Sequence, residues 1–142
     1  MKKKIFTLLA FSMITFASFG QINFGVGATY FNDLGVQARA AFDAGSFEVV
    51  PKATYFFTKG VTVLEIDADV HFNVAEIAEN PVYVLGGLGY HILSSSFAST
   101  SNLGINAGAG VRISNIFVEV KYAKILCENC GGDIAFTGGY MF

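Results

Sequence analysis

Apolar and polar side chains alternate with a period of two through most of the chain after residue 21. This is the period of a β-strand, whose successive side chains point to opposite faces. Short clusters of Asn, Asp, Gly and Ser separate the alternating segments and predict turns. We therefore expect no helix after residue 20 and eight strands, over Ile22–Tyr30, Gly35–Phe42, Phe47–Phe57, Thr62–Phe72, Val82–Ile92, Leu103–Ile113, Ile116–Tyr122 and Asp133–Phe142.

The segments have the length and composition of membrane strands. Most contain the ~9–11 residues that a tilted membrane strand needs. Charged residues make up 14% of the chain, whereas soluble domains usually carry ~25%. No window after the N-terminus has the ~18 consecutive apolar residues of a membrane helix. High apolarity without a long apolar run favours strands that cross a membrane.

The charges within the segments lie on one face only. Seventeen charged residues follow residue 20, and nine of them lie within segments, all on the polar face: Arg39, Glu48, Lys52, Glu65, Asp67, Asp69, Arg112, Glu119 and Lys121. The opposite face holds apolar and small side chains, where a charge would cost ~2–4 kcal/mol near the middle of a membrane. An apolar outside and a polar inside are typical of a transmembrane barrel, and a soluble lipid carrier has the reverse.

The sequence thus predicts an all-β fold, a closed, antiparallel, up-and-down transmembrane β-barrel of eight strands. Closure is expected because an open sheet edge in lipid leaves backbone groups unpaired, at several kcal/mol each. The outward aromatic side chains fall into two groups near the strand ends, as expected for rings in the headgroup zone. One group is Tyr30, Tyr55, Tyr90 and Tyr122, and the other is Phe24, Phe42, Phe47, Phe72, Tyr140 and Phe142.

The N-terminus has the pattern of a secretory signal peptide. Three lysines, Lys2 to Lys4, precede the apolar stretch Ile5–Phe16, and small residues at 17–20 allow cleavage before Gln21. The alternative is a retained anchor helix. We expect residues 1–20 to be the signal peptide and residues 21–142 the barrel. Loss of the three lysines changes the net charge from −2 to −5, which excludes a basic surface for nucleic acid.

Several stretches resemble a known family. They are the terminal aromatic pattern Ile134, Phe136, Tyr140 and Phe142, the glycine-rich stretches Tyr83–Tyr90 and Leu103–Arg112, and the stretch Phe117–Tyr122. In these the chain resembles the small eight-stranded outer-membrane β-barrels, the group that includes the OmpA membrane domain and OmpX. The resemblance implies export to the outer membrane, contact with its lipid, and recognition of Phe136, Tyr140 and Phe142 by the barrel-assembly machinery. The outer loops are shorter than those of family members with adhesion or receptor roles.

We also predict a topology, for the case that both termini face the periplasm. The periplasmic connections would then be Asp43–Ser46, Asn73–Asn80 and Ser114–Asn115. The outer loops would be Phe31–Leu34, Thr58–Val61, Leu93–Ser101 and Cys127–Gly132.

Three carboxylates share one strand face at Glu65, Asp67 and Asp69. Alternate residues of a strand lie ~6.6 Å apart, which is too far to hold one ion without a facing partner. We expect an ion-paired interior formed with the bases Arg39, Lys52, Arg112 and Lys121. A calcium-like site or a proton path is the alternative.

Cys127 and Cys130 are separated by two residues between the last two segments. In an exported protein this pair favours a disulfide that staples the loop. A zinc site would need further Cys or a nearby His, and a redox dithiol normally sits at a helix start.

His71 and His91 are single inward imidazoles, which we expect to be hydrogen-bonded fillers rather than catalysts. Ser94, Ser95 and Ser96 lie near His91 in sequence. An acyl-transfer site would also need an orienting acid and an oxyanion hole, and the pattern predicts neither. We therefore expect no enzyme and no cofactor.

Two functions remain open. In the first, the protein is a structural or surface-interaction barrel, because eight strands leave an interior that side chains can fill. In the second, it is a narrow pore for ions or small solutes, because the inward glycines of Val82–Ile92 and Leu103–Ile113 leave one wall bare. The sequence names no ligand and no surface partner.

Overall fold

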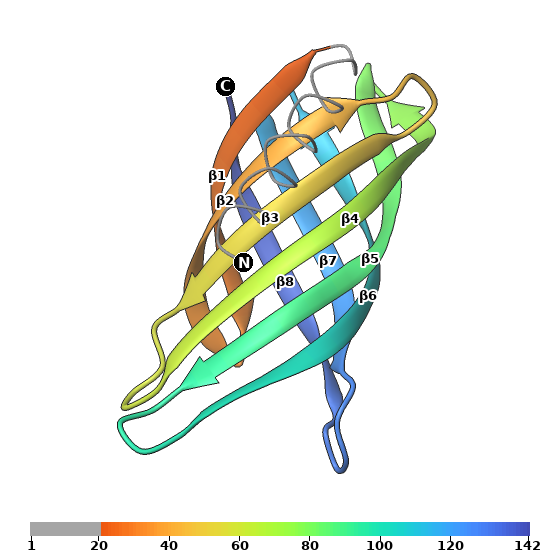
Figure 1. The fold of residues 1–142 in the computed structure, drawn as a ribbon. Coiled ribbons are helices and arrows are strands. Elements are labelled where there is room, and N and C mark those ends of the chain that lie inside the picture. The colour runs from red at the N-terminus through yellow and green to blue at the C-terminus, as the bar shows by residue number, and fades with distance from the viewer. Residues whose placement is uncertain (1–20) are drawn as a thin grey trace, which may run out of the picture.

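The computed structural model describes residues 21–142, and the predicted signal peptide lies outside the described residues. Eight strands follow one another: β1 Ile22–Phe31, β2 Asp33–Asp43, β3 Glu48–Phe56, β4 Thr62–Ile77, β5 Asn80–Ser94, β6 Ser99–Ile113, β7 Ile116–Ile125 and β8 Gly132–Met141. Each strand pairs antiparallel with its neighbour in sequence, and β8 pairs with β1 to close the barrel (Figure 1). The predicted fold, an antiparallel up-and-down barrel of eight strands, is confirmed. Among residues 21–142, no helix is long and apolar enough to cross a membrane.

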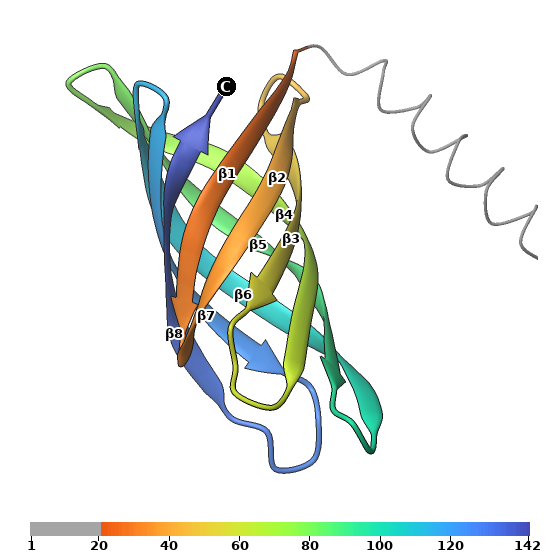
Figure 2. The same cartoon turned by 90° about the vertical axis from the view of Figure 1, so that its left-hand side faces the viewer.

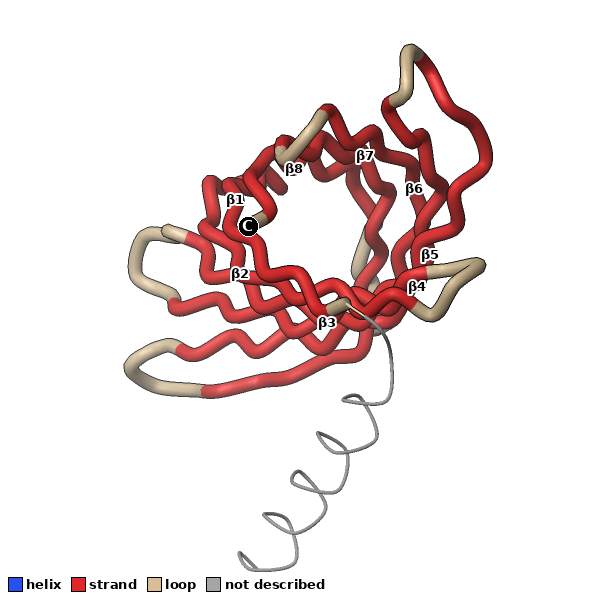
Figure 3. Tube along the Cα trace, turned by 90° about the horizontal axis from the view of Figure 1, so that it is seen from above, coloured by secondary structure: helices blue, strands red, loops and turns tan. Residues whose placement is uncertain are grey.

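The barrel is apolar outside and polar inside, the reverse of a soluble domain. Ile66 and Val118 point outward and are 49% and 51% exposed, whereas the alternating Asp67 and Glu119 are 2% and 1% exposed. This arrangement follows from the period of the strand, which sends every second side chain into the lumen. Viewed along its length, the wall forms a ring of strands (Figure 3).

The connections lie at two ends of the barrel. We call the end with the connections after β1, β3, β5 and β7 the loop end. The connections after β2, β4 and β6 lie together with the C-terminus at the opposite, turn end (Figures 1 and 2). The two groups of outward aromatic side chains lie close to these two ends. Tyr30, Tyr55, Tyr90 and Tyr122 lie near the loop end, and Phe24, Phe72, Tyr140 and Phe142 near the turn end.

The hairpin of β4 and β5 is longer than the alternation predicts. The segment Asn73–Asn80 was expected to be a connection, but only Ala78 and Glu79, both with positive φ, lie between the strands. A register shift between Asn73 and Ala75 marks a β-bulge, which inserts a residue and resets the alternation. The hairpin leans out beyond the rest of the turn end (Figure 2).

The connection between β5 and β6 is also shorter than predicted. The segment Leu93–Ser101 was expected to be a loop, but Ser99 to Ser101 belong to β6 and pair with Ser94 to Ile92 of β5. This part of β6 has no apolar alternation, because it extends beyond the level of the aromatic group at the loop end. Only residues 95–98 connect the two strands.

Candidate functional site

The nine charged side chains predicted to face inward all line the lumen, and together we call them the lumenal network. They are Arg39, Glu48, Lys52, Glu65, Asp67, Asp69, Arg112, Glu119 and Lys121. Seven are buried, and only Glu48 and Arg112 are half-buried. Each of the nine has an oppositely charged partner within 4.0 Å.

Arg39 on β2 and Glu119 on β7 form the central pair. Two guanidinium nitrogens donate to the two carboxylate oxygens at 2.6 and 2.8 Å, a bidentate geometry that strengthens the interaction. The guanidinium also lies 3.7 Å from the centroid of the Phe117 ring, and the hydroxyl of Tyr83 donates to Glu119 at 2.8 Å. The two strands lie on different parts of the wall, so this pair ties the wall together across the lumen.

Lys52 and Asp69 form a second pair, between the neighbouring strands β3 and β4. The amide of Asn106 on β6 donates to the other oxygen of the Asp69 carboxylate at 3.0 Å. Nζ of Lys52 also lies 4.0 Å from an oxygen of Glu119. The second pair is therefore continuous with the central one.

Lys121 on β7 contacts two carboxylates of β4. Its Nζ donates to Glu65 at 3.2 Å and to Asp67 at 2.8 Å. Nδ1 of His91 lies 3.4 Å from Glu65. One lysine thus holds two of the three carboxylates in the row, and Lys52 holds the third, Asp69.

Glu48 on β3 and Arg112 on β6 form the pair nearest the turn end. Two hydrogen bonds of 3.0 and 2.9 Å join them in a second bidentate arrangement. Their side chains are 19% and 21% exposed. This pair spans the lumen between two strands that are not neighbours, since β4 and β5 lie between them on one side.

Uncharged polar side chains complete the network toward the loop end. Gln37 accepts a hydrogen bond from Nε of Arg39 at 2.9 Å and donates to Thr54 at 3.2 Å. The hydroxyls of Thr29 and Thr137 lie 3.0 Å apart. The sequence interpretation stressed charges and did not name these residues as part of a site, although the same inward alternation places each of them in the lumen.

The inward glycines of β5 and β6 do not leave a bare wall. A Cβ added at Gly87 would collide with Asp69, and one at Gly89 would collide with Asp67. A Cβ at Gly104 would lie 2.6 Å from the His91 ring. The facing polar side chains lie against these glycines, so the space that favoured a narrow pore is occupied.

The carboxylate row does not form a metal cluster. Among residues 21–142, no group of three or more His, Cys, Asp or Glu side chains could hold a metal ion. The three carboxylates contact lysines instead. Lys121 pairs with Glu65 and Asp67, and Lys52 pairs with Asp69, so the row belongs to the ion pairs of the lumenal network.

The two histidines lie at different levels of the lumen and contact no serine. His71 stacks on Tyr83, with ring centroids 4.7 Å apart, and Nε2 of His71 lies 3.9 Å from Glu119. Ser95 forms its hydrogen bonds with the backbone of Ala98 in the β5–β6 connection. The described residues therefore bring no serine and histidine together as a nucleophile and its base.

The remaining predicted residues lie at the two ends of the barrel. Cys127 and Cys130 form a disulfide in the β7–β8 connection at the loop end. Phe136, Tyr140 and Phe142 point outward. Tyr140 and Phe142 lie near the turn end, whereas Phe136 is the register partner of Tyr30, near the loop end. The backbone amide of Phe142 donates to the carbonyl of Phe24 at 2.7 Å, so the last residue extends the seam between β8 and β1.

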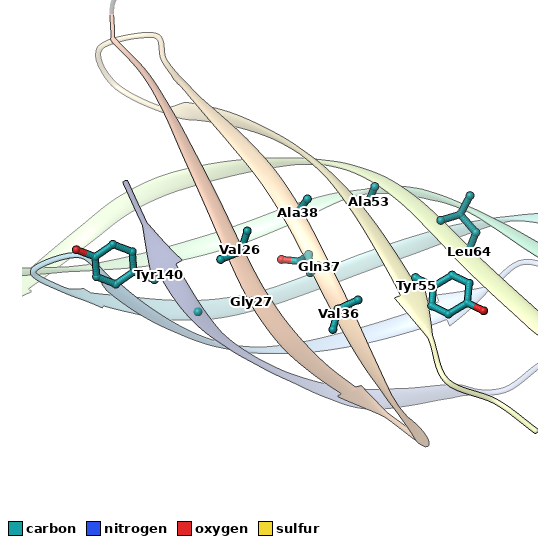
Figure 4. Close-up of a pocket in the computed structure, with 10 residues that line it drawn as sticks. Val26, Gly27, Val36, Gln37, Ala38, Ala53, Tyr55, Leu64 and Tyr140 are labelled. Atoms are coloured by element: carbon teal, nitrogen blue, oxygen red, sulfur yellow. The ribbon is translucent and has the colours of Figure 1, made fainter.

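The outer wall carries a shallow apolar groove over β8, β1, β2, β3 and β4 (Figure 4). Its volume is about 730 Å³. Small side chains at Ala38 and Ala53 form its floor, and Tyr140 and Tyr55 stand at opposite ends. The exposed lining of the groove is almost entirely apolar.

No protein-family model and no curated protein matches the chain. Solved structures do match. The N-terminal β-barrel domain of Pseudomonas aeruginosa OprF aligns with a TM-score of 0.58 and 14% identity, over 85% of this chain and 96% of that one. The chain has the fold of a small eight-stranded outer-membrane barrel.

Two designed proteins share this fold. A de novo designed transmembrane β-barrel aligns with a TM-score of 0.54 and 20% identity, over 87% of this chain and 96% of that one. A second design, solved by NMR in solution, aligns with a TM-score of 0.51 and 12% identity, over 87% and 93%. At sequence identities this low, these structural alignments establish the fold of the barrel and nothing about the role of its lumen.

Proposed function

We propose that the protein is an integral outer-membrane β-barrel with a structural or surface-interaction role, and that its lumenal network closes the interior. It would reach the outer membrane by signal-peptide-dependent export and enter it through the barrel-assembly machinery. Its apolar outer wall, its two aromatic groups and its likeness to the OprF barrel support this placement. The role is non-enzymatic.

The observation that carries the proposal is the pairing of all nine lumenal charges. Burial of an unpaired charge is strongly unfavourable, and a buried pair is retained when geometry and hydrogen bonds are good. Arg39–Glu119 and Glu48–Arg112 both have bidentate geometry, and both tie non-neighbouring strands together. These two pairs therefore cross-link strands that are not neighbours in the wall.

A narrow pore is the competing function, and the lumen does not favour it. The glycines of β5 and β6 face Asp67, Asp69 and His91 at contact distance. An eight-stranded barrel has an interior only wide enough for its side chains, and here long charged side chains from both walls fill it.

Conductance in planar bilayers tests the proposal. The purified, folded protein should give no stepwise current above that of the bare bilayer. Discrete, reproducible channels with a fixed ion preference would contradict the closed lumen and support the pore. Heat-modifiable gel mobility of the same preparation verifies that the inserted protein is folded.

A further inference from the structure

A polar cleft lies at the loop end, between the β3–β4 and β5–β6 connections. We call it the outer cleft, and its polar lining comes from Tyr55, Thr58, Thr62, Ser94, Ser95 and Ser96. Thr62 and Ser94 face each other as register partners on β4 and β5. The cleft has a volume of about 380 Å³, within the ~300–1,000 Å³ range of small-ligand sites.

Of the six hydroxyls that line the outer cleft, four form no hydrogen bond with other described residues. Thr58 is engaged with Asp33 at 2.8 Å, and Ser95 is engaged with the backbone of Ala98. The hydroxyls of Tyr55, Thr62, Ser94 and Ser96 make no such contact in the described part of the chain. Each hydroxyl offers one donor and two acceptor positions, so the cleft presents a cluster of free, neutral hydrogen-bonding groups.

The lining carries no charged side chain, and this sets the ligand class. An anion or a metal ion would need fixed charges or several carboxylate oxygens. A neutral polyhydroxyl compound matches closely spaced hydroxyls that can donate or accept. The ring of Tyr55 adds an apolar surface to the cleft, and the fully exposed ring of Phe97 follows Ser96 in the same connection.

We propose that the outer cleft binds a neutral sugar unit. Its level on the barrel fits this ligand, because Tyr55 belongs to the aromatic group that marks the headgroup zone. With the loop end facing outward, which rests on the proposed function, the sugar comes from a glycolipid headgroup beside the barrel or from a soluble oligosaccharide. Both sources present the same hydroxyl chemistry to the cleft.

The binding test uses the folded full-length barrel in detergent micelles, with maltose and chitobiose as soluble probes followed by NMR titration. We expect saturable shifts at the outer cleft with at least one probe. The triple variant Thr62→Val/Ser94→Ala/Ser96→Ala should weaken binding by about tenfold or more, since three ordinary hydrogen bonds are lost. The matched control Ser99→Ala/Thr100→Val/Ser114→Ala changes the same residue types outside the cleft and should bind like the parent.

Two results would overturn the sugar site. One is the absence of saturable binding of either probe to folded parent protein. The other is equal affinity for the parent and the triple variant. Because the titration does not depend on conductance or on location in the cell, its failure leaves the closed outer-membrane barrel standing.

A second arm identifies the source of the sugar. Parent barrel in nanodiscs is titrated with the soluble probe, with lipopolysaccharide either present or absent in the bilayer. If lipopolysaccharide weakens apparent probe binding to the parent, and this effect of lipopolysaccharide is absent in the triple variant, the cleft is assigned to a membrane glycolipid. Unchanged probe binding in both nanodiscs assigns it to a soluble oligosaccharide.

Discussion

Arg39 of β2 donates two hydrogen bonds, of 2.6 and 2.8 Å, to the carboxylate of Glu119 on β7 through the lumen. Only β1 and β8 separate these strands along the shorter way around the wall, and the seam where the chain closes on itself lies between them. The pair therefore fastens the seam from inside, while the backbone hydrogen bonds between β1 and β8 fasten it along the wall.

The pair Glu48–Arg112 should contribute less than a fully buried pair. Its side chains are 19% and 21% exposed, so water stabilises whichever charge is left alone. We expect Arg112→Ala to destabilise the barrel clearly, but by less than the ~3–5 kcal/mol typical of breaking a fully buried pair. Urea unfolding from lipid vesicles measures this, with Lys124→Ala, an exposed base of β7, as the matched control. A loss no larger than that of the control would show that this pair does not hold the turn end together.

Gly87 and Gly86 are adjacent on β5 and should differ sharply in their tolerance of a methyl group. A Cβ at Gly87 would collide with Asp69 and with the backbone carbonyl of Ala68, whereas a Cβ at Gly86 has its nearest neighbour at 3.7 Å. Overpacking of a filled interior costs ~1–3 kcal/mol. Gly87→Ala should therefore lower the stability of the barrel by that amount, and Gly86→Ala should be near neutral. Urea unfolding from lipid vesicles measures both effects. If both variants are as stable as the parent, the lumen beside β5 has more free space than the structure indicates.

The sequence was sufficient to predict the wall but not the contacts inside it. Alternation alone placed Asp67 and Glu119 in the lumen, because a strand has only two faces. Which acid meets which base depends on the stagger of the strands around the closed wall, and neighbouring residues do not encode it. The sequence therefore could not show that Lys121 would form ion pairs with both Glu65 and Asp67.

The misplaced features have local physical causes. The extension of β4 was missed because the bulge near Asn73 interrupts the alternation, and because Ala78 and Glu79 are unusual residues for a turn with positive φ. The glycines of β5 and β6 were interpreted as empty space because the side chains that lie against them come from the neighbouring strands of the sheet. Both features require knowledge of the partner strand.

Phe142 should be required for efficient assembly. It extends the β8–β1 seam, and its side chain is exposed on the outer wall at the turn end. Deletion of Phe142, or Phe142→Asp, should reduce the amount of folded protein in the outer membrane, measured by fractionation and heat-modifiable mobility. Phe97→Asp, at an exposed loop position, serves as the control and should assemble normally. Undiminished assembly of the Phe142 variants would count against a C-terminal signal.

The orientation of the barrel can be tested by thiol labelling of intact cells. Ser96 lies in the β5–β6 connection at the loop end, and Ser114 lies in the β6–β7 connection at the turn end. With the loop end outside, a membrane-impermeant reagent should label Ser96→Cys and should not label Ser114→Cys until the cells are lysed. The opposite pattern would mean that the barrel is inserted the other way up.

A double-mutant cycle on Arg39 and Glu119, measured by urea unfolding from lipid vesicles, tests the central claim most directly. Both side chains are nearly fully buried, so Glu119→Ala should cost ~3–5 kcal/mol by leaving Arg39 unpaired. The double variant Arg39→Ala/Glu119→Ala should cost less than the sum of the two single losses, while Glu128→Ala in the β7–β8 connection should change little. If Arg39→Ala and Glu119→Ala both fold as stably as the parent, the lumenal network does not hold the barrel closed, and a water-filled channel becomes the better account.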